Sequence, residues 1–115
     1  MADARSLLAA ISAVTGVSVA VVMDRGGFVI EWAGEGMEAE DLAAVASDLL
    51  ESCDGVGRDL GQGGMRKLIC EFEEGVVLVM GGDAATRLAV ALRDPSALDA
   101  VRHVAGELML ALERL

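Results

Sequence analysis

The chain has 115 residues, of which 54% are hydrophobic and only 3% aromatic, and its 19 acidic and 9 basic side chains give a formal net charge of −10. That charge would repel phosphate backbones and anionic lipid headgroups, so we expect no role on nucleic acids or on membrane surfaces. The length suits a single domain, residues 1–115, with an aliphatic core. Because no apolar run approaches the ~18 residues that span a bilayer, we expect a cytoplasmic protein.

The first third of the chain predicts a helix followed by a β-hairpin. Asp3 or Ser6 can cap the helix, and Gly16 follows the last of its apolar residues. Residues 17–24 are rich in β-branched side chains and apolar on both faces, which is typical of a strand near the middle of a sheet. A Gly-containing turn then lets residues 28–33 return as the antiparallel partner.

Residues 38–57 predict a long helix whose apolar surface is wider than one packing contact needs, about 160°. Acids in its first turn complement the helix dipole. One apolar sector is bulky and suits a sheet, whereas the next is mostly small and suits the close approach of another helix. The bulky sector consists of Leu42, Val45, Leu49, Cys53 and Val56, and the small one of Ala39, Ala43, Ala46, Leu50 and Gly57.

The second half of the chain predicts three strands and a final helix. Residues 65–73 alternate between apolar and polar side chains, which indicates a strand with a partly solvated face at the edge of a sheet. Residues 76–82 and 86–93 complete a meander. Asp94 then serves as N-cap, with Pro95 at the first position of a helix that continues to the C-terminus.

This order, αββαβββα, predicts an α+β fold: a five-stranded antiparallel sheet with the two terminal helices on one face and the central helix on the other. The small-residue sector would then face water in a monomer, which forgoes about 1.5–3 kcal/mol of burial for Leu50 alone. A twofold dimer would cover this sector and could also pair the edge strand with its own copy. The predicted dimer interface therefore consists of Ala39, Ala43, Ala46, Leu50, Lys67, Ile69 and Glu71.

The residues that could carry chemistry form no recognisable constellation. His103, the only histidine, lies beside the apolar stripe of the last helix, and we expect it at the surface or at the boundary of the core rather than in a catalytic or metal site. Cys53 and Cys70 lie within apolar patterns, so we expect two buried free thiols without zinc-site spacing. The many carboxylate pairs are explained by solvated faces. We therefore expect no catalytic residue, no metal, no cofactor and no enzymatic activity.

The element order and four segments together resemble the roadblock family, the dynein-light-chain type of domain with many bacterial members. These segments are TGVSVAVVMDRGGFVIEWAG, EDLAAVASDLLESC, RDLGQGG and LICEFEEGVVLVMGGDAATRLAVALR. The similarity runs from about Ser6 to Arg93. It implies a profilin-like sheet, a homodimer or heterodimer joined through the central helix and the adjoining edge strand, and a role as scaffold or regulator of Ras-like small GTPases.

Two functions remain open at this stage. The first is a non-enzymatic homodimeric regulator or scaffold of a Ras-like small GTPase, in which GTPase activation is one form of regulation. For this function the predicted partner surface consists of Glu40, Ser47, Glu51 and Arg58. The alternative is a small-molecule sensor or a general protein-interaction module without a GTPase partner. The absence of Tyr and the scarcity of polar groups along the apolar faces argue against the sensor.

Overall fold

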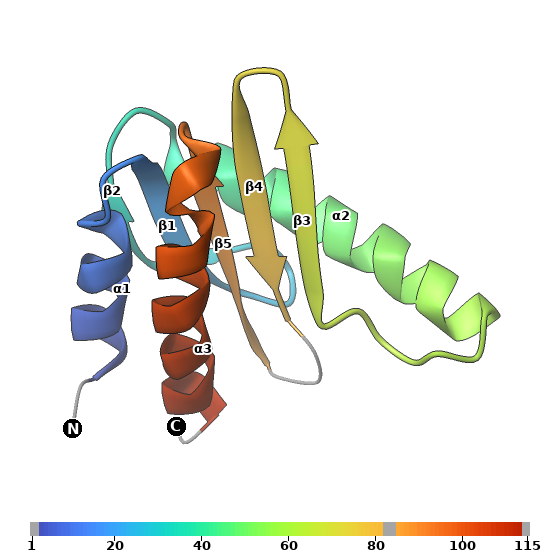
Figure 1. Ribbon diagram of the computed structural model, residues 1–115. Helices are drawn as coiled ribbons and strands as arrows, with labels where there is room; N and C mark the ends of the chain where they lie inside the picture. The colour runs from blue at the N-terminus through green and yellow to red at the C-terminus, as the bar shows by residue number, and fades with distance from the viewer. Residues whose placement is uncertain (1–2, 82–84, 114–115) are drawn as a thin grey trace.

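A five-stranded antiparallel sheet lies between helices in the computed structural model, which describes residues 3–81 and 85–113 (Figure 1). The predicted element order, αββαβββα, is confirmed, with one short 3-10 turn before the last helix. The elements are α1 (Ala4–Ser12), β1 (Val17–Asp24), β2 (Val29–Gly34), α2 (Ala39–Asp59), β3 (Lys67–Phe72), β4 (Gly75–Met80), β5 (Thr86–Leu92), η1 (Pro95–Ala97) and α3 (Leu98–Glu113).

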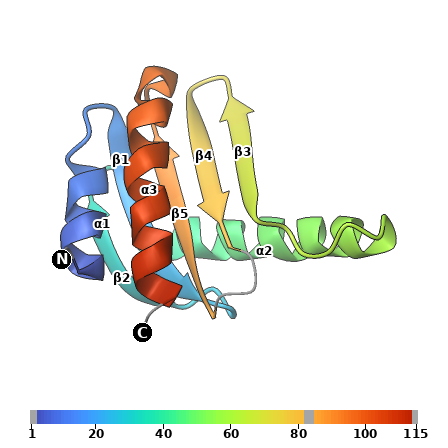
Figure 2. The ribbon, with the colours of Figure 1, turned by 60° about the horizontal axis from the view of Figure 1, so that its bottom comes forward.

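The strands follow the order β2-β1-β5-β4-β3, so β2 and β3 form the two edges of the sheet. Helices α1 and α3 cover one face, and α2 crosses the other (Figures 1 and 2). The sheet therefore separates two aliphatic cores, one shared with the terminal helices and one shared with α2. This arrangement confirms the predicted fold class and places β1 inside the sheet, as its two-sided hydrophobicity requires.

An aspartate caps α1 and another caps the 3-10 turn η1 that leads into α3. Of the two cap candidates for α1, Asp3 is the N-cap, and Asp94 precedes Pro95 as the sequence predicts. The Asp3 carboxylate accepts a hydrogen bond of 2.8 Å from the backbone N–H of Ser6, and Asp94 accepts one of 3.0 Å from that of Ser96. These backbone hydrogen bonds, and then those to the serine side chains, hold the pKa of both aspartates below its usual value. The two caps satisfy N–H groups that have no partner within their own helix.

Helix α2 contradicts the predicted roles of its two apolar sectors. The small-residue sector, assigned to a dimer contact, is buried against the chain's own sheet: Ala39, Ala43, Ala46 and Leu50 are 5%, 0%, 0% and 1% exposed. In the predicted sheet-facing sector, by contrast, Val45 and Val56 are 54% and 58% exposed. The sectors are therefore exchanged, with Leu42 buried at their boundary.

The composition of the sheet explains this exchange. The face beneath α2 carries Ala89 and Ala91 of β5 between the larger side chains of β1 and β4. Small residues on the helix allow its backbone to lie close to such a surface, so that few gaps remain between the layers. A helix presenting its bulky sector would stand farther from the two alanines and leave the space above them poorly filled.

Only the first part of α2 is supported by the sheet. The helix has 21 residues, a length of about 31 Å at 1.5 Å per residue, and all of its buried residues lie between Ala39 and Leu50. Figures 1 and 2 both show the remainder projecting past β3. The projecting part is tied to the following loop by a hydrogen bond of 2.6 Å from the Met65 backbone N–H to the Asp54 carboxylate.

Candidate interaction surfaces

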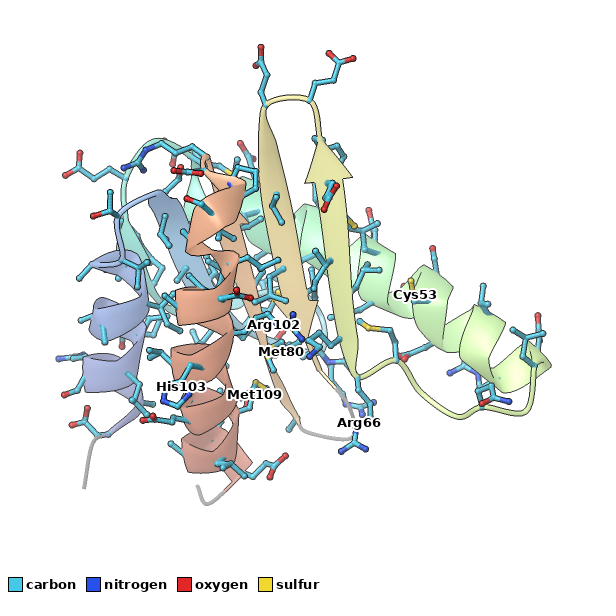
Figure 3. All side chains as sticks on the ribbon, viewed as in Figure 1. Cys53, Arg66, Met80, Arg102, His103 and Met109 are labelled. Atoms are coloured by element: carbon cyan, nitrogen blue, oxygen red, sulfur yellow. The ribbon has the colours of Figure 1, made fainter. Side chains whose placement is uncertain are left out.

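One exposed apolar row runs along α2 and continues past its end. It consists of Val45, Leu49, Cys53, Val56 and Leu60, and we call it the α2 stripe. Val45, Val56 and Leu60 are 54%, 58% and 68% exposed, whereas Leu49 and Cys53 are half-buried. Figure 3 shows Cys53 on the part of α2 that lies beyond β3. Apolar side chains at this spacing on a soluble protein are typical of a contact surface for another helix.

The α2 stripe faces the end of the sheet where β3 and β4 are joined by their turn. On the opposite flank of the helix, Ser47 lies against Gly27, where an added Cβ would come within 2.9 Å of the serine Cβ. Gly27 belongs to the β1–β2 turn. The strand registers place that turn and the β3–β4 turn at opposite ends of the sheet. Asp24, before the first turn, pairs with Thr86 at the start of β5, whereas Val76, after the second turn, pairs with Leu92 at the end of β5.

Strand β3 adds apolar surface at the same end. Leu68 packs into the core under α2, and the alternation of strand residues puts Cys70 and Phe72 on the same face. Phe72 is 62% exposed and both cysteines are free, half-buried thiols. The prediction of free thiols is confirmed, but the prediction that both are buried is wrong, because Cys70 lies on the edge strand and Cys53 lies on the part of α2 beyond that edge.

The remaining residues of the predicted dimer interface lie on the free edge of the sheet. Lys67 and Glu71 are exposed, and Ile69 is half-buried against the core on the side of α1 and α3. Among the described residues β3 pairs with β4 alone, so its outer backbone groups have no strand partner in this chain. The edge position is confirmed, and pairing with a second copy stays a prediction.

The predicted GTPase-binding residues share one flank of α2. At about 100° per residue, Glu40, Ser47, Glu51 and Arg58 fall within an arc of about 40°, opposite the α2 stripe. Three of these side chains are exposed, and Ser47 is half-buried beside Gly27. The helix therefore carries an apolar flank and a charged flank on either side of its buried face, and one partner can bind each flank without covering the other.

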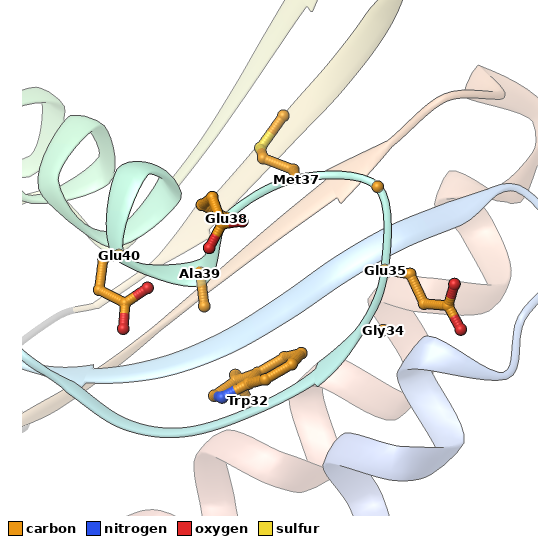
Figure 4. A pocket seen from close by; sticks show the side chains of 8 residues that line it. Trp32, Gly34, Glu35, Met37, Glu38, Ala39 and Glu40 are labelled. Atoms are coloured by element: carbon orange, nitrogen blue, oxygen red, sulfur yellow. The ribbon is translucent and has the colours of Figure 1, made fainter.

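A further apolar region, which the sequence patterns did not single out, lies at the β2 edge of the sheet. Phe28, Ile30, Trp32 and Met37 are 75%, 54%, 53% and 46% exposed. Trp32 and Met37 line a cavity of about 620 Å³ at the start of α2 (Figure 4). The only sign of this region in the sequence is that residues 28, 30 and 32 share one face of the predicted strand. The sequence does not show whether another element packs on that face.

Residues 3–81 and 85–113 include no group of three or more His, Cys, Asp or Glu side chains that could hold a metal ion. The imidazole of His103 is 80% exposed, as predicted, and lies 3.4 Å from the carboxylate of Glu107 on the same helix (Figure 3). Within the same residues, no helix combines the length and the hydrophobicity needed to cross a bilayer.

Comparisons with known proteins agree with this architecture. The sequence model of the Roadblock/LC7 domain matches residues 4–91. The gliding protein MglB from Thermus thermophilus is 20% identical, with a TM-score of 0.83 over 96% of this chain and 86% of that one. Myxococcus xanthus MglB is 15% identical, with a TM-score of 0.83 over 96% of this chain and 92% of that one. A Roadblock/LC7 domain from Streptomyces avermitilis is 22% identical, with a TM-score of 0.75 over 98% of this chain and 94% of that one.

At these identities the solved structures show a shared fold and nothing more specific. No curated protein matches the sequence.

Proposed function

This chain belongs to the Roadblock/LC7 domain family, and from that premise we propose that it is a non-enzymatic, homodimeric regulator or scaffold of a Ras-like small GTPase. The proposal that the partner is a GTPase comes from the family resemblance. The observation that carries the association is the α2 stripe, an apolar row in which Val45, Val56 and Leu60 are more than half exposed among the described residues. The flank with Glu40 and Arg58 is the proposed surface for the GTPase.

In the proposed dimer, two copies of α2 lie side by side and antiparallel on one face of a joined sheet. A twofold axis near the middle of the α2 stripe brings Val45 opposite the partner's Val56 and Leu49 opposite the partner's Cys53, since these pairs are symmetrically spaced along the helix. The same operation brings the two β3 edges together around Lys67, Ile69 and Glu71. Each projecting helix end then lies over the partner's sheet.

The burial pattern supports this arrangement over one built on the alanine sector. Ala43 and Ala46 have no exposed surface left to give to a partner. Val45, Val56 and Phe72 are each more than half exposed, and Phe72 lies on the α2 face of β3, where a second α2 would lie in this arrangement. A single symmetric contact would therefore remove the exposed apolar row and the open strand edge together.

The charged flank stays free in such a dimer. Because Glu40, Ser47, Glu51 and Arg58 lie opposite the α2 stripe, the pairing of two stripes leaves both rows exposed. Its two carboxylates favour a basic patch on the GTPase, and such complementarity acts mainly on the rate and specificity of association. Regulation in this scheme repositions groups of the GTPase, and the chain contributes no catalytic group of its own.

The first experiment measures mass in solution. Light scattering at tens of micromolar is expected to give twice the chain mass, and a monomer would contradict the dimer. The second experiment captures GTPases from the native source on immobilised protein and then assays GTP hydrolysis.

The variant Glu51→Arg is expected to weaken this capture without changing the dimer mass. The matched control is Glu107→Arg, which makes the same charge change at an exposed position on α3. This variant is expected to capture GTPases as the wild type does. Specific capture of proteins other than GTPases would favour the general interaction module instead.

A further inference from the structure

All three aromatic side chains of this protein lie at its surface. The sequence contains two Phe, one Trp and no Tyr, and these residues are Phe28, Trp32 and Phe72. They are 75%, 53% and 62% exposed. Phe72 belongs to the proposed dimer surface, whereas Phe28 and Trp32 lie at the other edge of the sheet with Ile30 and Met37. We call these four residues the β2 patch.

The backbone beside the β2 patch is a free strand edge. Within the described residues β2 pairs only with β1, and the strand order puts β2 at the far edge from β3. A β-bulge at Ile30 interrupts the register, so regular pairing geometry is limited to Glu31–Gly34. This regular part of the edge lies beside the cavity lined by Trp32 and Gly34. An extended segment can add to such an edge through main-chain hydrogen bonds.

The cavity has the chemistry of a site for a cation. Trp32 pairs with Val21, whose side chain belongs to the core under α2, so the indole lies on the α2 side of the sheet. Figure 4 shows the indole near the start of α2, where the side chains of Glu38, the N-cap residue, and Glu40, in the first turn, extend. Glu35, Met37, Ala39 and two glycines also line the cavity, and no Lys or Arg contributes to it.

These neighbours distinguish between possible occupants. A Lys or Arg side chain can place its apolar stem against Met37 and its charge over the indole, where the ring face and the carboxylates both attract it. A second copy of this chain would instead bring the carboxylates of its own Glu35, Glu38 and Glu40 into the same place, and like charges would oppose that contact.

We propose that the β2 edge and its Trp32 cavity bind an extended, basic segment of a partner protein, which adds as a strand and inserts one Lys or Arg side chain between Trp32 and the glutamates. This surface is separate from the α2 stripe, and it shares only Glu40 with the charged flank centred on Ser47. It does not rest on the proposed function, since a chain that regulates no GTPase could bind such a segment equally well.

Trp32 reports its own occupancy, because it is the only tryptophan. The probes are three synthetic peptides of about eight residues, a typical strand length. The first alternates Val and Lys, the second replaces each Lys by Glu, and the third carries Pro at its centre. We expect the first peptide to change the Trp32 emission saturably, and the other two to leave it unchanged. Equal responses to the acidic peptide would overturn the charge argument, and equal responses to the proline peptide would overturn strand addition.

Variants then locate the site by fluorescence anisotropy of the labelled Val-Lys peptide. Trp32→Ala is expected to weaken binding about tenfold through loss of the cation–π contact and apolar surface. Glu40→Lys, on an exposed side chain, is expected to weaken it further while the circular dichroism spectrum stays unchanged. Glu74→Lys makes the same charge change on the exposed β3–β4 turn and is the control.

Wild-type affinity in Trp32→Ala, or equal losses in Glu40→Lys and Glu74→Lys, would show attraction by net charge alone and overturn the proposal. No peptide binding at millimolar concentration would also overturn it. A change of Trp32 emission with protein concentration alone would assign the edge to a second copy of this chain and overturn it as well.

Discussion

Replacing Val56 by aspartate tests the orientation of α2 and the proposed dimer together. The side chain is 58% exposed in the single chain, so the aspartate keeps access to water and each subunit should remain folded. Fully burying a valine contributes about 1.5 kcal/mol or more, and roughly half of that remains available to a dimer contact at this exposure. Both copies of the chain lose this burial energy, so the dimer loses about 2 kcal/mol in total.

A loss of about 2 kcal/mol weakens the dimer roughly 30-fold, and the desolvation of two carboxylates in the contact adds to the effect. The measurement is sedimentation equilibrium over a range of concentrations, with circular dichroism to show that the helices persist. The matched control is Ala44→Asp, an exposed position on the polar side of the same helix. We expect Val56→Asp to shift the equilibrium to monomer and Ala44→Asp to leave it unchanged.

The variant Ala43→Asp completes this experiment, because Ala43 is 0% exposed. An ionised carboxylate at a dry position costs several kcal/mol, a large share of the 5–15 kcal/mol that typically stabilises a folded domain. We therefore expect Ala43→Asp to melt far below the wild type rather than to form a folded monomer. A dimeric Val56→Asp would remove the α2 stripe from the interface, and a folded, monomeric Ala43→Asp would refute the packing of α2 on its own sheet.

Two further predictions concern single contacts. In Asp94→Asn the loss of the capping carboxylate should lower stability at neutral pH. Folding lowers the pKa of Asp94, so the carboxylate contributes to the free energy of unfolding above its ordinary pKa of 3.8. That contribution is lost as the pH falls through the lower pKa of the folded state, so melting curves of the two proteins should converge in acid. A constant difference at every pH would contradict the role of the charge. In Gly27→Ala the positive φ of +84° and the contact with Ser47 should destabilise the fold by about 1 kcal/mol or more, measured by urea unfolding, and an unchanged midpoint would contradict that strain.

The fold could be predicted from the sequence because its signals are local. The aspartate caps, the two-sided hydrophobicity of residues 17–24 and the alternation around Cys70 each depend on neighbours along the chain. The hairpin and the three-stranded meander followed from their turns, whereas the pairing of β1 with β5, which joins these two units into one sheet, was not predicted. The two ends of α2 were also close to their predicted positions.

The orientation of α2 could not be predicted in the same way. Its two apolar sectors lie next to each other, and which one meets the sheet depends on Ala89 and Ala91, which lie far away in the sequence. Size alone suggested that bulky residues face the sheet, whereas the fit between small side chains decided the packing. The exposure of Trp32 is equally non-local, because it depends on the absence of a covering element.

The aliphatic interior has a consequence for how this protein can vary. Exchanges among Ala, Val, Leu and Met inside either core alter packing and stability, and neither core includes any of the three aromatic rings. Phe28, Trp32 and Phe72 can conversely be replaced without opening a hole in the interior. Thermal robustness and partner choice thus depend on different sets of positions, so a lineage can adapt one while leaving the other untouched.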